Sequence, residues 1–336
     1  MTAQIDKFIW DLTYACPLRC IHCYSESGRR AARMLSRDDA MRVVDVVCDA
    51  RPQWMSISGG EPLLAPWWRE AVRRLHDAGI AVTMFTSGWF VDEQTAEGLA
   101  TSVTTVAVSV DGSDARIHDA VRGRNGAFVK AMTALELLNR VKEQRAADGE
   151  FCCSLGIDYT VTRSGMRDLE DFVEAMTTRF PSVDFIRFGA VIPSGLAAEE
   201  EFERDELLTY DQLVELTDSQ RQLAAHVRSA AEVSVTDVRY FLPGSSASGA
   251  GEAIASIEAD GQMRAFPIYE AKVGNVLEEP IDVLWARVLA WRQEPFVVEQ
   301  LRSIRTVADW ARVARALDRR YGSPDDQARI ARRGRS

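Results

Sequence analysis

Short apolar runs alternate with longer amphipathic stretches through roughly the first two thirds of the chain. This alternation predicts successive strand–helix units around a parallel sheet. The candidate strands are Phe8–Tyr14, Trp54–Ser58, Ala81–Thr86, Thr105–Val110, Leu155–Val161 and Phe185–Ala190. The amphipathic stretches between them predict helices over Arg37–Asp49, Trp67–Ala78, Asp92–Ala100, Ala127–Arg145 and Leu169–Arg179. Ser36 precedes the first helix as an N-cap, with acidic residues following in the first turn.

The pattern changes beyond the last of these strands. A further amphipathic helix is predicted over about Asp211–Ser229, and Pro243–Gly251 is rich in Gly and Ser, which predicts a linker. Two short apolar segments, Ala253–Glu258 and Gln262–Phe266, flank an Asp-Gly pair, and this arrangement is typical of a β-hairpin. The rest of the chain has a helical pattern and ends in an arginine-rich tail that we expect to be solvated: Arg329, Arg332, Arg333 and Arg335.

Composition narrows the class of protein. The chain has 336 residues, of which 46% are hydrophobic and 27% charged, as in ordinary globular proteins. Forty basic against fifty acidic residues give a net charge of −10, which argues against broad binding to nucleic acids or anionic membranes. No apolar run approaches the roughly 18 to 20 residues that span a bilayer, and no signal-peptide pattern is present. We therefore expect a cytoplasmic protein.

Three of the six cysteines lie within eight residues, at Cys16, Cys20 and Cys23, on the loop that follows the first predicted strand. In an α/β barrel this end of the strand belongs to the active-site face. Cysteine thiolates are the usual ligands of iron–sulfur clusters, and three of them leave one iron of a four-iron cluster open for reaction. The alternative is a zinc site with His22 as the fourth ligand.

The spacing CxxxCxxC, followed by the aromatic Tyr24, resembles the motif of the radical S-adenosylmethionine (radical SAM) superfamily. Ser58-Gly-Gly-Glu-Pro62 after the second strand is similar to the family's GGEP element, and His118–Phe128 is similar to a run in its peptide and natural-product branch. The resemblance implies a [4Fe-4S] cluster held by the three cysteines and S-adenosylmethionine as cosubstrate. It also implies the cofactor-binding residues, namely Tyr24, Gly59, Gly60, Glu61, Ser87, Ser109, Asp111 and Arg122.

The same resemblance implies the architecture. We expect an α/β fold in which residues 1–230 form a partial (β/α)6 TIM-like barrel. Residues 231–336 are expected to form a small α+β cap similar to the SPASM or twitch extension, together with a helical tail. The implied chemistry is reductive cleavage of S-adenosylmethionine to a 5′-deoxyadenosyl radical, with a flavodoxin or ferredoxin-type protein as electron donor.

Alternation along the strands predicts which side chains face the barrel interior. The polar sets, which include Asp11 and Asp158, should face the cavity, and Arg187 stands out within the otherwise apolar sixth strand. These three residues are the candidate substrate site, with Arg187 as an anchor for a carboxylate or phosphate. The alternative is that these groups satisfy one another as a buried network. Cys153, just before the fifth strand, is a candidate hydrogen-atom donor, and its alternative role is a structural core cysteine.

The chain has no cysteine after Cys153, although SPASM or twitch extensions usually carry cysteines for auxiliary clusters. Without that electron acceptor, a redox-neutral, lyase- or isomerase-type outcome is favoured over a net oxidation. Only about seven residues precede the first strand, which leaves little room for a leader-peptide-binding domain. We therefore expect a small sugar- or nucleoside-like substrate in natural-product biosynthesis. The alternative is a maturase that modifies a ribosomally made peptide.

Overall fold

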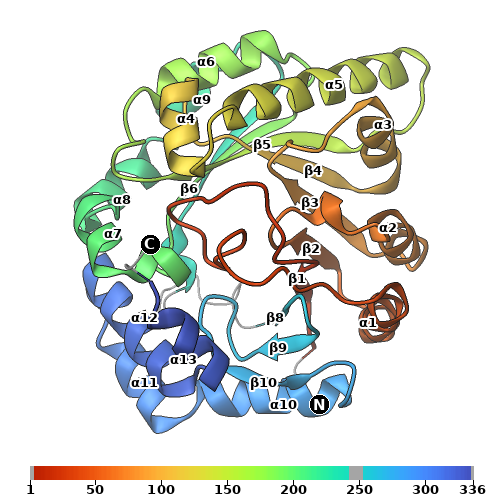
Figure 1. Cartoon of the computed structure of the whole chain (residues 1–336). Coiled ribbons are helices and arrows are strands. Elements are labelled where there is room, and N and C mark those ends of the chain that lie inside the picture. The colour runs from red at the N-terminus through yellow and green to blue at the C-terminus, as the bar shows by residue number, and fades with distance from the viewer. Residues whose placement is uncertain (1–3, 242–252, 334–336) are drawn as a thin grey trace.

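A computed structural model describes residues 4–241 and 253–333. Its centre is one curved sheet of ten strands in the order β10-β9-β8-β1-β2-β3-β4-β5-β6-β7 (Figure 1). Seven strands follow the chain order across this sheet: β1 (Lys7–Asp11), β2 (Trp54–Ser58), β3 (Ala81–Thr86), β4 (Thr105–Ser109), β5 (Ser154–Val161), β6 (Phe185–Ala190) and β7 (Glu232–Thr236). Every neighbouring pair within this series is parallel, so all seven carboxyl ends meet at one edge of the sheet.

Helices cover the outer face of this parallel sheet (Figure 1). They are α1 (Arg37–Ala50), α2 (Trp68–Asp77), α3 (Glu93–Ser102), α4 (Ala115–Arg122), α5 (Ala127–Ala147) and α6 (Leu169–Arg179). Ser36 caps α1 as predicted, because its hydroxyl accepts a hydrogen bond from the backbone N–H of Asp39. The expected architecture, a partial TIM-like barrel with a C-terminal cap, is confirmed.

The alternation of buried and cavity-facing positions fixes the core. On β1, Phe8 and Trp10 are fully buried beneath the helices, whereas Lys7 and Ile9 line the barrel interior. The same rule operates on β5, where Ile157 packs in the core and Asp158 faces inward. Apolar side chains therefore seal the outer layer, and polar ones remain for the mouth and interior of the barrel.

Three more helices follow β6: α7 (Glu200–Asp205), α8 (Tyr210–Asp218) and α9 (Gln220–Ala225). The prediction of a single helix over Asp211–Ser229 is wrong, because the helix is interrupted at Ser219, between α8 and α9. The predicted linker Pro243–Gly251 lies outside the described residues. Within the described ranges no helix combines the length and the apolar character that crossing a bilayer requires.

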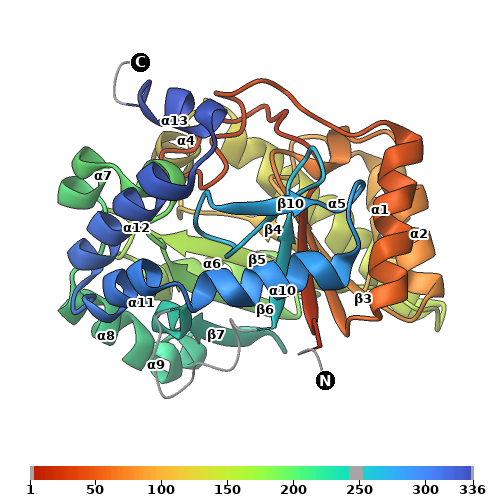
Figure 2. The same cartoon turned by 90° about the horizontal axis from the view of Figure 1, so that it is seen from below.

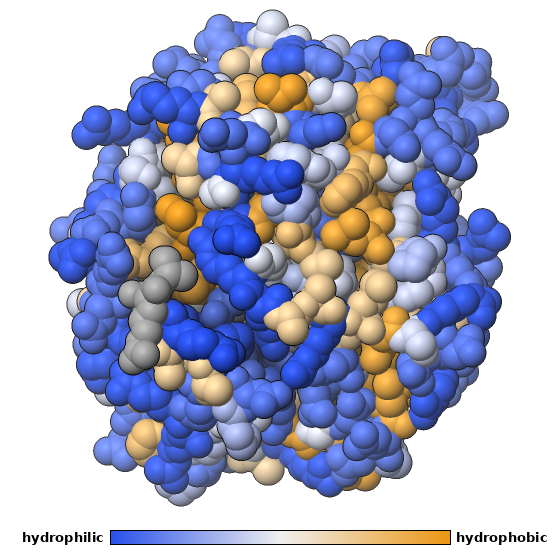
Figure 3. All heavy atoms as spheres, viewed as in Figure 1, coloured by the Kyte–Doolittle hydropathy of each residue, from blue (hydrophilic) through white to orange (hydrophobic). Residues whose placement is uncertain are grey.

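The hairpin predicted around Asp260-Gly261 is confirmed. β8 (Ile254–Ile257) pairs antiparallel with β9 (Gln262–Arg264), and β10 (Lys272–Asn275) extends the hairpin. β8 also pairs in parallel with β1, which joins the extension to the barrel sheet. Helices α10 (Ile281–Arg292), α11 (Pro295–Arg302), α12 (Val307–Tyr321) and α13 (Pro324–Ile330) pack beside the hairpin (Figure 2). Hydrophilic side chains cover most of the face in Figure 3, with smaller apolar patches between them.

The expectation of a solvated arginine tail is wrong for Arg329 and Arg333, whose side chains are 8% and 2% exposed. Both pair with the buried carboxylate of Glu26 on the cysteine loop, with Arg333 Nε 2.9 Å from Glu26 Oε1. Arg329 also reaches Glu270, 2.9 Å away. Buried carboxylates require such partners, and this need orders the segment. Arg335 lies outside the described residues.

Candidate active site

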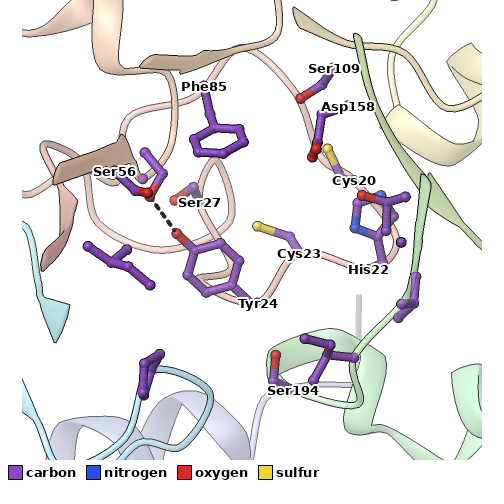
Figure 4. A pocket seen from close by; sticks show the side chains of 18 of the residues that line it. Cys20, His22, Cys23, Tyr24, Ser27, Ser56, Phe85, Ser109, Asp158 and Ser194 are labelled. Atoms are coloured by element: carbon purple, nitrogen blue, oxygen red, sulfur yellow. Dashed lines mark hydrogen bonds between the residues drawn. The ribbon is translucent and has the colours of Figure 1, made fainter. Parts of the chain in front are cut away.

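A cavity of about 470 Å³ opens inside the barrel, beneath the loop that follows β1. The three thiols of that loop, those of Cys16, Cys20 and Cys23, line it together with inward-facing side chains of β1 to β6. Figure 4 shows Cys20, Cys23, Ser109 and Asp158 directed into this space from different elements. The structure thus brings the cysteine motif and the strand ends to one place, as the sequence predicts.

Backbone contacts fix the path of the cysteine loop. The N–H groups of Arg19 and Ile21 donate to carbonyls of α4, at 3.1 and 2.9 Å. Gly28, at the end of the loop, donates to the carbonyl of Tyr14 at 3.1 Å. On the far side, Leu196 N–H donates to the carbonyl of Cys23. These bonds hold the three thiols in place over the barrel mouth.

Gly59 and Gly60, after β2, lie against the backbone that leads into the loop. A Cβ on Gly60 would come within 2.1 Å of the carbonyl oxygen of Ala15, and one on Gly59 within 2.7 Å of that of Thr13. Gly59 also has φ of +116°, which disfavours other residues. Only glycine therefore fits, and both residues line the cavity.

Glu61 does not reach the cavity, contrary to its prediction as a cofactor-binding residue. It is fully buried and accepts hydrogen bonds from the Thr86 hydroxyl at 2.8 Å and the Ser87 backbone N–H at 2.9 Å. Burial raises its pKa, and these hydrogen bonds oppose the shift. Glu61 instead ties the glycine turn to the end of β3, and Ser87, which lines the cavity, is held by it.

Asp111 and Arg122, which were both predicted to bind the cofactor, instead pair with each other. Arg122 Nη2 lies 2.8 Å from Asp111 Oδ2, and His22 Nε2 lies 3.0 Å from the same oxygen. Asp111 is buried behind the cavity wall and accepts a further bond from the N–H of Thr160. Burial opposes ionisation, but Arg122 and His22 outweigh it and hold the pKa of Asp111 below its ordinary value. Arg122 alone of the pair lines the cavity, with Nη1 3.9 Å from Cys20 Sγ.

These contacts also bear on the zinc alternative, because His22 is directed to Asp111. The geometry gives no support to a mononuclear site with His22 as a ligand.

Asp11, a predicted substrate-site residue, is engaged by neighbouring hydroxyls. It accepts hydrogen bonds from Tyr24 and from Ser58, the latter at 2.9 Å. Burial raises the pKa of Asp11, although both bonds oppose the shift. The Tyr24 hydroxyl also lies 3.2 Å from Ser58 Oγ. Asp11 thus holds Tyr24 in the cavity wall and does not itself line the cavity.

Asp158 and Arg187 lie side by side on β5 and β6 and both line the cavity. Arg187 Nε is 3.2 Å from Asp158 Oδ1 but has no hydrogen-bond partner among the described residues. Burial raises the pKa of Asp158, and the charge of Arg187 opposes the rise. The pair therefore satisfies itself only in part.

Cys153 lies at the wrong end of β5 for the role of hydrogen-atom donor. Cys153 precedes the first residue of β5 and lies about 16 Å, at 3.3 Å per residue, from Asp158, the nearest residue of this strand that lines the cavity. It is buried in the core, and its carbonyl accepts a hydrogen bond from Lys142. The structure supports its alternative role as a core cysteine.

Lys7 is a cavity residue that the sequence reasoning missed. The predicted first strand began one residue later, at Phe8, although alternation with Ile9 and Asp11 gives Lys7 the inward-facing parity. Extending the strand by one residue would have found it.

Comparison with known proteins identifies the family. The family model described as the radical SAM superfamily matches residues 10–144. Mycofactocin maturase MftC of Mycobacterium ulcerans is 33% identical over 294 residues, covering 84% of this chain and 75% of the relative. The chain belongs to the radical SAM superfamily.

Two further relatives cover most of this radical SAM enzyme. An AdoMet-dependent heme synthase of Nitratidesulfovibrio vulgaris is 25% identical over 303 residues, which cover 84% of this chain and 79% of that protein. The crystal structure of SuiB from Streptococcus suis bound to S-adenosylmethionine has a TM-score of 0.64 at 16% identity, covering 90% of this chain and 69% of SuiB. The likeness to SuiB establishes the fold.

A [4Fe-4S] cluster and S-adenosylmethionine are therefore the cofactors, and the cavity suits them. Three thiols from one loop face the same space, the ligand set that leaves one iron of such a cluster open. Burial raises the pKa of the Cys20 thiol to about 11, and the guanidinium of Arg122 beside it opposes the rise. The glycine turn provides the close backbone approach that a bound cofactor needs.

The prediction of a small sugar- or nucleoside-like substrate, and of a small molecule as the partner, is corrected by these comparisons. The relative with the highest identity of the three is named a maturase. SuiB is also known in a crystal structure bound to its precursor peptide SuiA. The first finding favours the peptide alternative over the small metabolite, whereas the likeness to SuiB, at 15% identity, shows the fold alone.

Proposed function

We propose that this radical SAM enzyme is a maturase that modifies a peptide. The similarity to MftC, which extends through 84% of the chain and hence through both barrel and extension, carries the proposal. The cavity supports it, because it continues from the three thiols past Phe85 and Asp158 to the inner face of the barrel. A side chain of a peptide laid over the mouth would have space to enter.

In this proposal the wall residues divide the work. Cys16, Cys20 and Cys23 hold the cluster, and Gly59, Gly60, Tyr24, Ser87 and Ser109 surround the bound S-adenosylmethionine. When bound, these cofactors supply a 5′-deoxyadenosyl radical that removes a hydrogen atom from a C–H bond. Phe85 and the other apolar side chains that line the cavity exclude water, while Asp158 and Arg187 orient the group that reacts.

We also propose a redox-neutral, lyase- or isomerase-type outcome. Residues 154–336 contain no cysteine, so the extension offers no thiolates for a second cluster that would accept the electron of the product radical. We keep the proposed division into a barrel of residues 1–230 and an extension of residues 231–336, except that β7 (Glu232–Thr236) joins the barrel sheet, and we keep a flavodoxin or ferredoxin-type electron donor. All six cysteines are free thiols, which fits a reducing compartment such as the cytoplasm.

The test is peptide modification by the reconstituted enzyme. Anaerobically reconstituted protein, S-adenosylmethionine and dithionite are incubated with short precursor peptides encoded beside the gene. Mass spectrometry should then detect 5′-deoxyadenosine together with a mass change in one peptide, and neither product should form with Cys16→Ala. Formation of 5′-deoxyadenosine with turnover of a metabolite and no altered peptide would overturn the proposal.

A further inference from the structure

The inner part of the cavity carries more positive than negative charge. Its charged lining residues are Lys7, Arg122, Arg187 and Asp158, so that, among the described residues, three cations face one carboxylate. Arg122 is neutralised from behind the wall by Asp111. Arg187 faces Asp158, and Lys7 has no paired carboxylate among the described residues, in a chain whose overall charge is −10. The local excess is therefore opposite in sign to the whole protein.

Neither of these two cations is satisfied by the described residues. Lys7 has no ion-pair partner among them, and burial together with the charge of Arg187 lowers its pKa. Arg187 keeps an unbonded Nε and a side chain that is 36% exposed to the cavity. Cations that are partly withdrawn from water without full partners are destabilising, and an incoming anion relieves that cost.

The guanidinium of Arg187 is also held in place before any ligand arrives. Its Cζ lies 5.2 Å from the ring centre of Phe185 and 5.9 Å from that of Phe85. Aromatic faces restrain a guanidinium while leaving its N–H edge free to donate. That planar edge matches a carboxylate, to which it can donate two parallel hydrogen bonds.

We propose that Lys7 and Arg187 form a subsite that binds a carboxylate of the substrate peptide. That the carboxylate belongs to a peptide rests on the proposed function, whereas the binding of a carboxylate at this subsite does not. The carboxylate is either the side chain of an acidic residue or the C-terminus of the peptide. Asp158 occupies part of the subsite in the free enzyme and competes for Arg187.

Binding of small probes tests the subsite without requiring turnover. The reconstituted enzyme, saturated with S-adenosylmethionine, is titrated with N-acetyl-glutamate methylamide, N-acetyl-glutamine and N-acetyl-glutamine methylamide. The first has only a side-chain carboxylate, the second only a terminal one, and the third has none. We expect at least one acid to bind roughly tenfold tighter than the neutral probe, and the better acid identifies the source of the carboxylate.

Variants assign that preference to the two cations. Lys7→Met and Arg187→Met should each remove most of it, whereas Lys7→Arg and Arg187→Lys, which keep the charge, should retain part of it. Asp158→Asn should shift affinity in the opposite direction and strengthen binding of the acid severalfold, because the competing carboxylate is gone. A fold defect would not produce that gain. Lys130→Met, on the exposed face of α5, serves as the matched control.

Equal affinity for acid and neutral probes would overturn the subsite, as would a preference that survives both methionine variants. A preference seen only without S-adenosylmethionine would also overturn it, since the pair would then serve the cofactor. Should the acids bind as expected while no peptide is ever modified, the subsite stands and the proposed function fails.

Discussion

The barrel interior and the C-terminal extension both contain charged residues that are wholly or partly withdrawn from water, yet they use them differently. In the extension, Arg264 lies between Glu258 and Glu270, and all three side chains are at most 2% exposed. In the barrel, Arg187 and Lys7 face a cavity and are only partly matched. Residue type alone does not separate the two cases. Charged side chains that pair across packed elements stabilise the fold, whereas charged side chains at the inner face of the sheet remain available to bind a ligand.

The largest effect should come from the loop of the barrel mouth. Cys20→Ala removes a cluster ligand, so formation of 5′-deoxyadenosine from S-adenosylmethionine and dithionite should fall to the level seen without protein. Cys48→Ala, a cysteine of α1 outside the cavity, is the matched control and should retain wild-type formation. Retained activity in Cys20→Ala would refute the assignment of the cluster ligands.

The extension should show the largest loss of stability without a direct effect on chemistry. Arg264→Met leaves Glu258 and Glu270 buried without their shared cation, which should lower the free energy of unfolding by about 3–5 kcal/mol. Arg312→Met breaks an exposed pair with Asp309 and should cost less than about 1 kcal/mol. Chemical denaturation measures both, and equal costs would contradict the distinction between buried and exposed pairs.

In the extension, a buried carboxyl group with a raised pKa should lower the stability of the protein as pH rises. Burial, with the charge of Glu270, raises the pKa of Asp318 from 3.8 to about 7. Between these values the folded chain keeps a proton that the unfolded chain releases, so Asp318 reduces stability as pH rises from about 4 to 7. In Asp318→Asn, the decrease in the free energy of unfolding over this pH range should be smaller by about 1–3 kcal/mol, as measured by denaturation at several pH values.

In the barrel, a buried histidine with a lowered pKa should instead lower the stability of the protein as pH falls. Burial, with the charge of Arg122, lowers the pKa of His118 from 6.5 to about 4, and its Nδ1 accepts a hydrogen bond from the Asp111 N–H. Between these values only the unfolded chain takes up a proton, so His118 reduces stability as pH falls from 6.5 to about 4. His118→Gln should flatten this acid limb by about 1–3 kcal/mol, and an unchanged acid limb would contradict the buried neutral histidine.

Helix caps should cost the same in both regions, and this is the smallest expected effect. Ser36 caps α1 in the barrel, and Thr306 caps α12 in the extension through a reciprocal bond with Asp309. Ser36→Ala and Thr306→Ala should each lower the unfolding free energy by about 1 kcal/mol. A severalfold difference between them would show that tertiary context extends even to these exposed turns.

Much of the barrel could be predicted from the sequence, because its order is local. The strands Trp54–Ser58 and Phe185–Ala190 and the helix Leu169–Arg179 occur at the predicted residues. Alternation of apolar and polar positions also correctly placed Asp158 inward, and Arg187, the charged residue of an otherwise apolar strand, faces the cavity too. The helix Ala115–Arg122 was not predicted.

Pairings between distant residues could not be predicted in the same way. Nothing near Arg333 in the sequence indicates that it meets Glu26, 307 residues earlier, or that Asp111 is shared by Arg122 and His22. Glu61 illustrates the same limit, since the motif that contains it suggested a cofactor contact and the folded chain directs it to Thr86 and Ser87.

The sequence by itself determined the superfamily, the parallel strand–helix order and the three cluster thiols, because these depend on short-range spacing and on the periodicity of burial. Only the tertiary structure decided which charges face the cavity and which neutralise one another. That choice depends on which elements pack together and on how much water they exclude, and both are properties of the assembled fold.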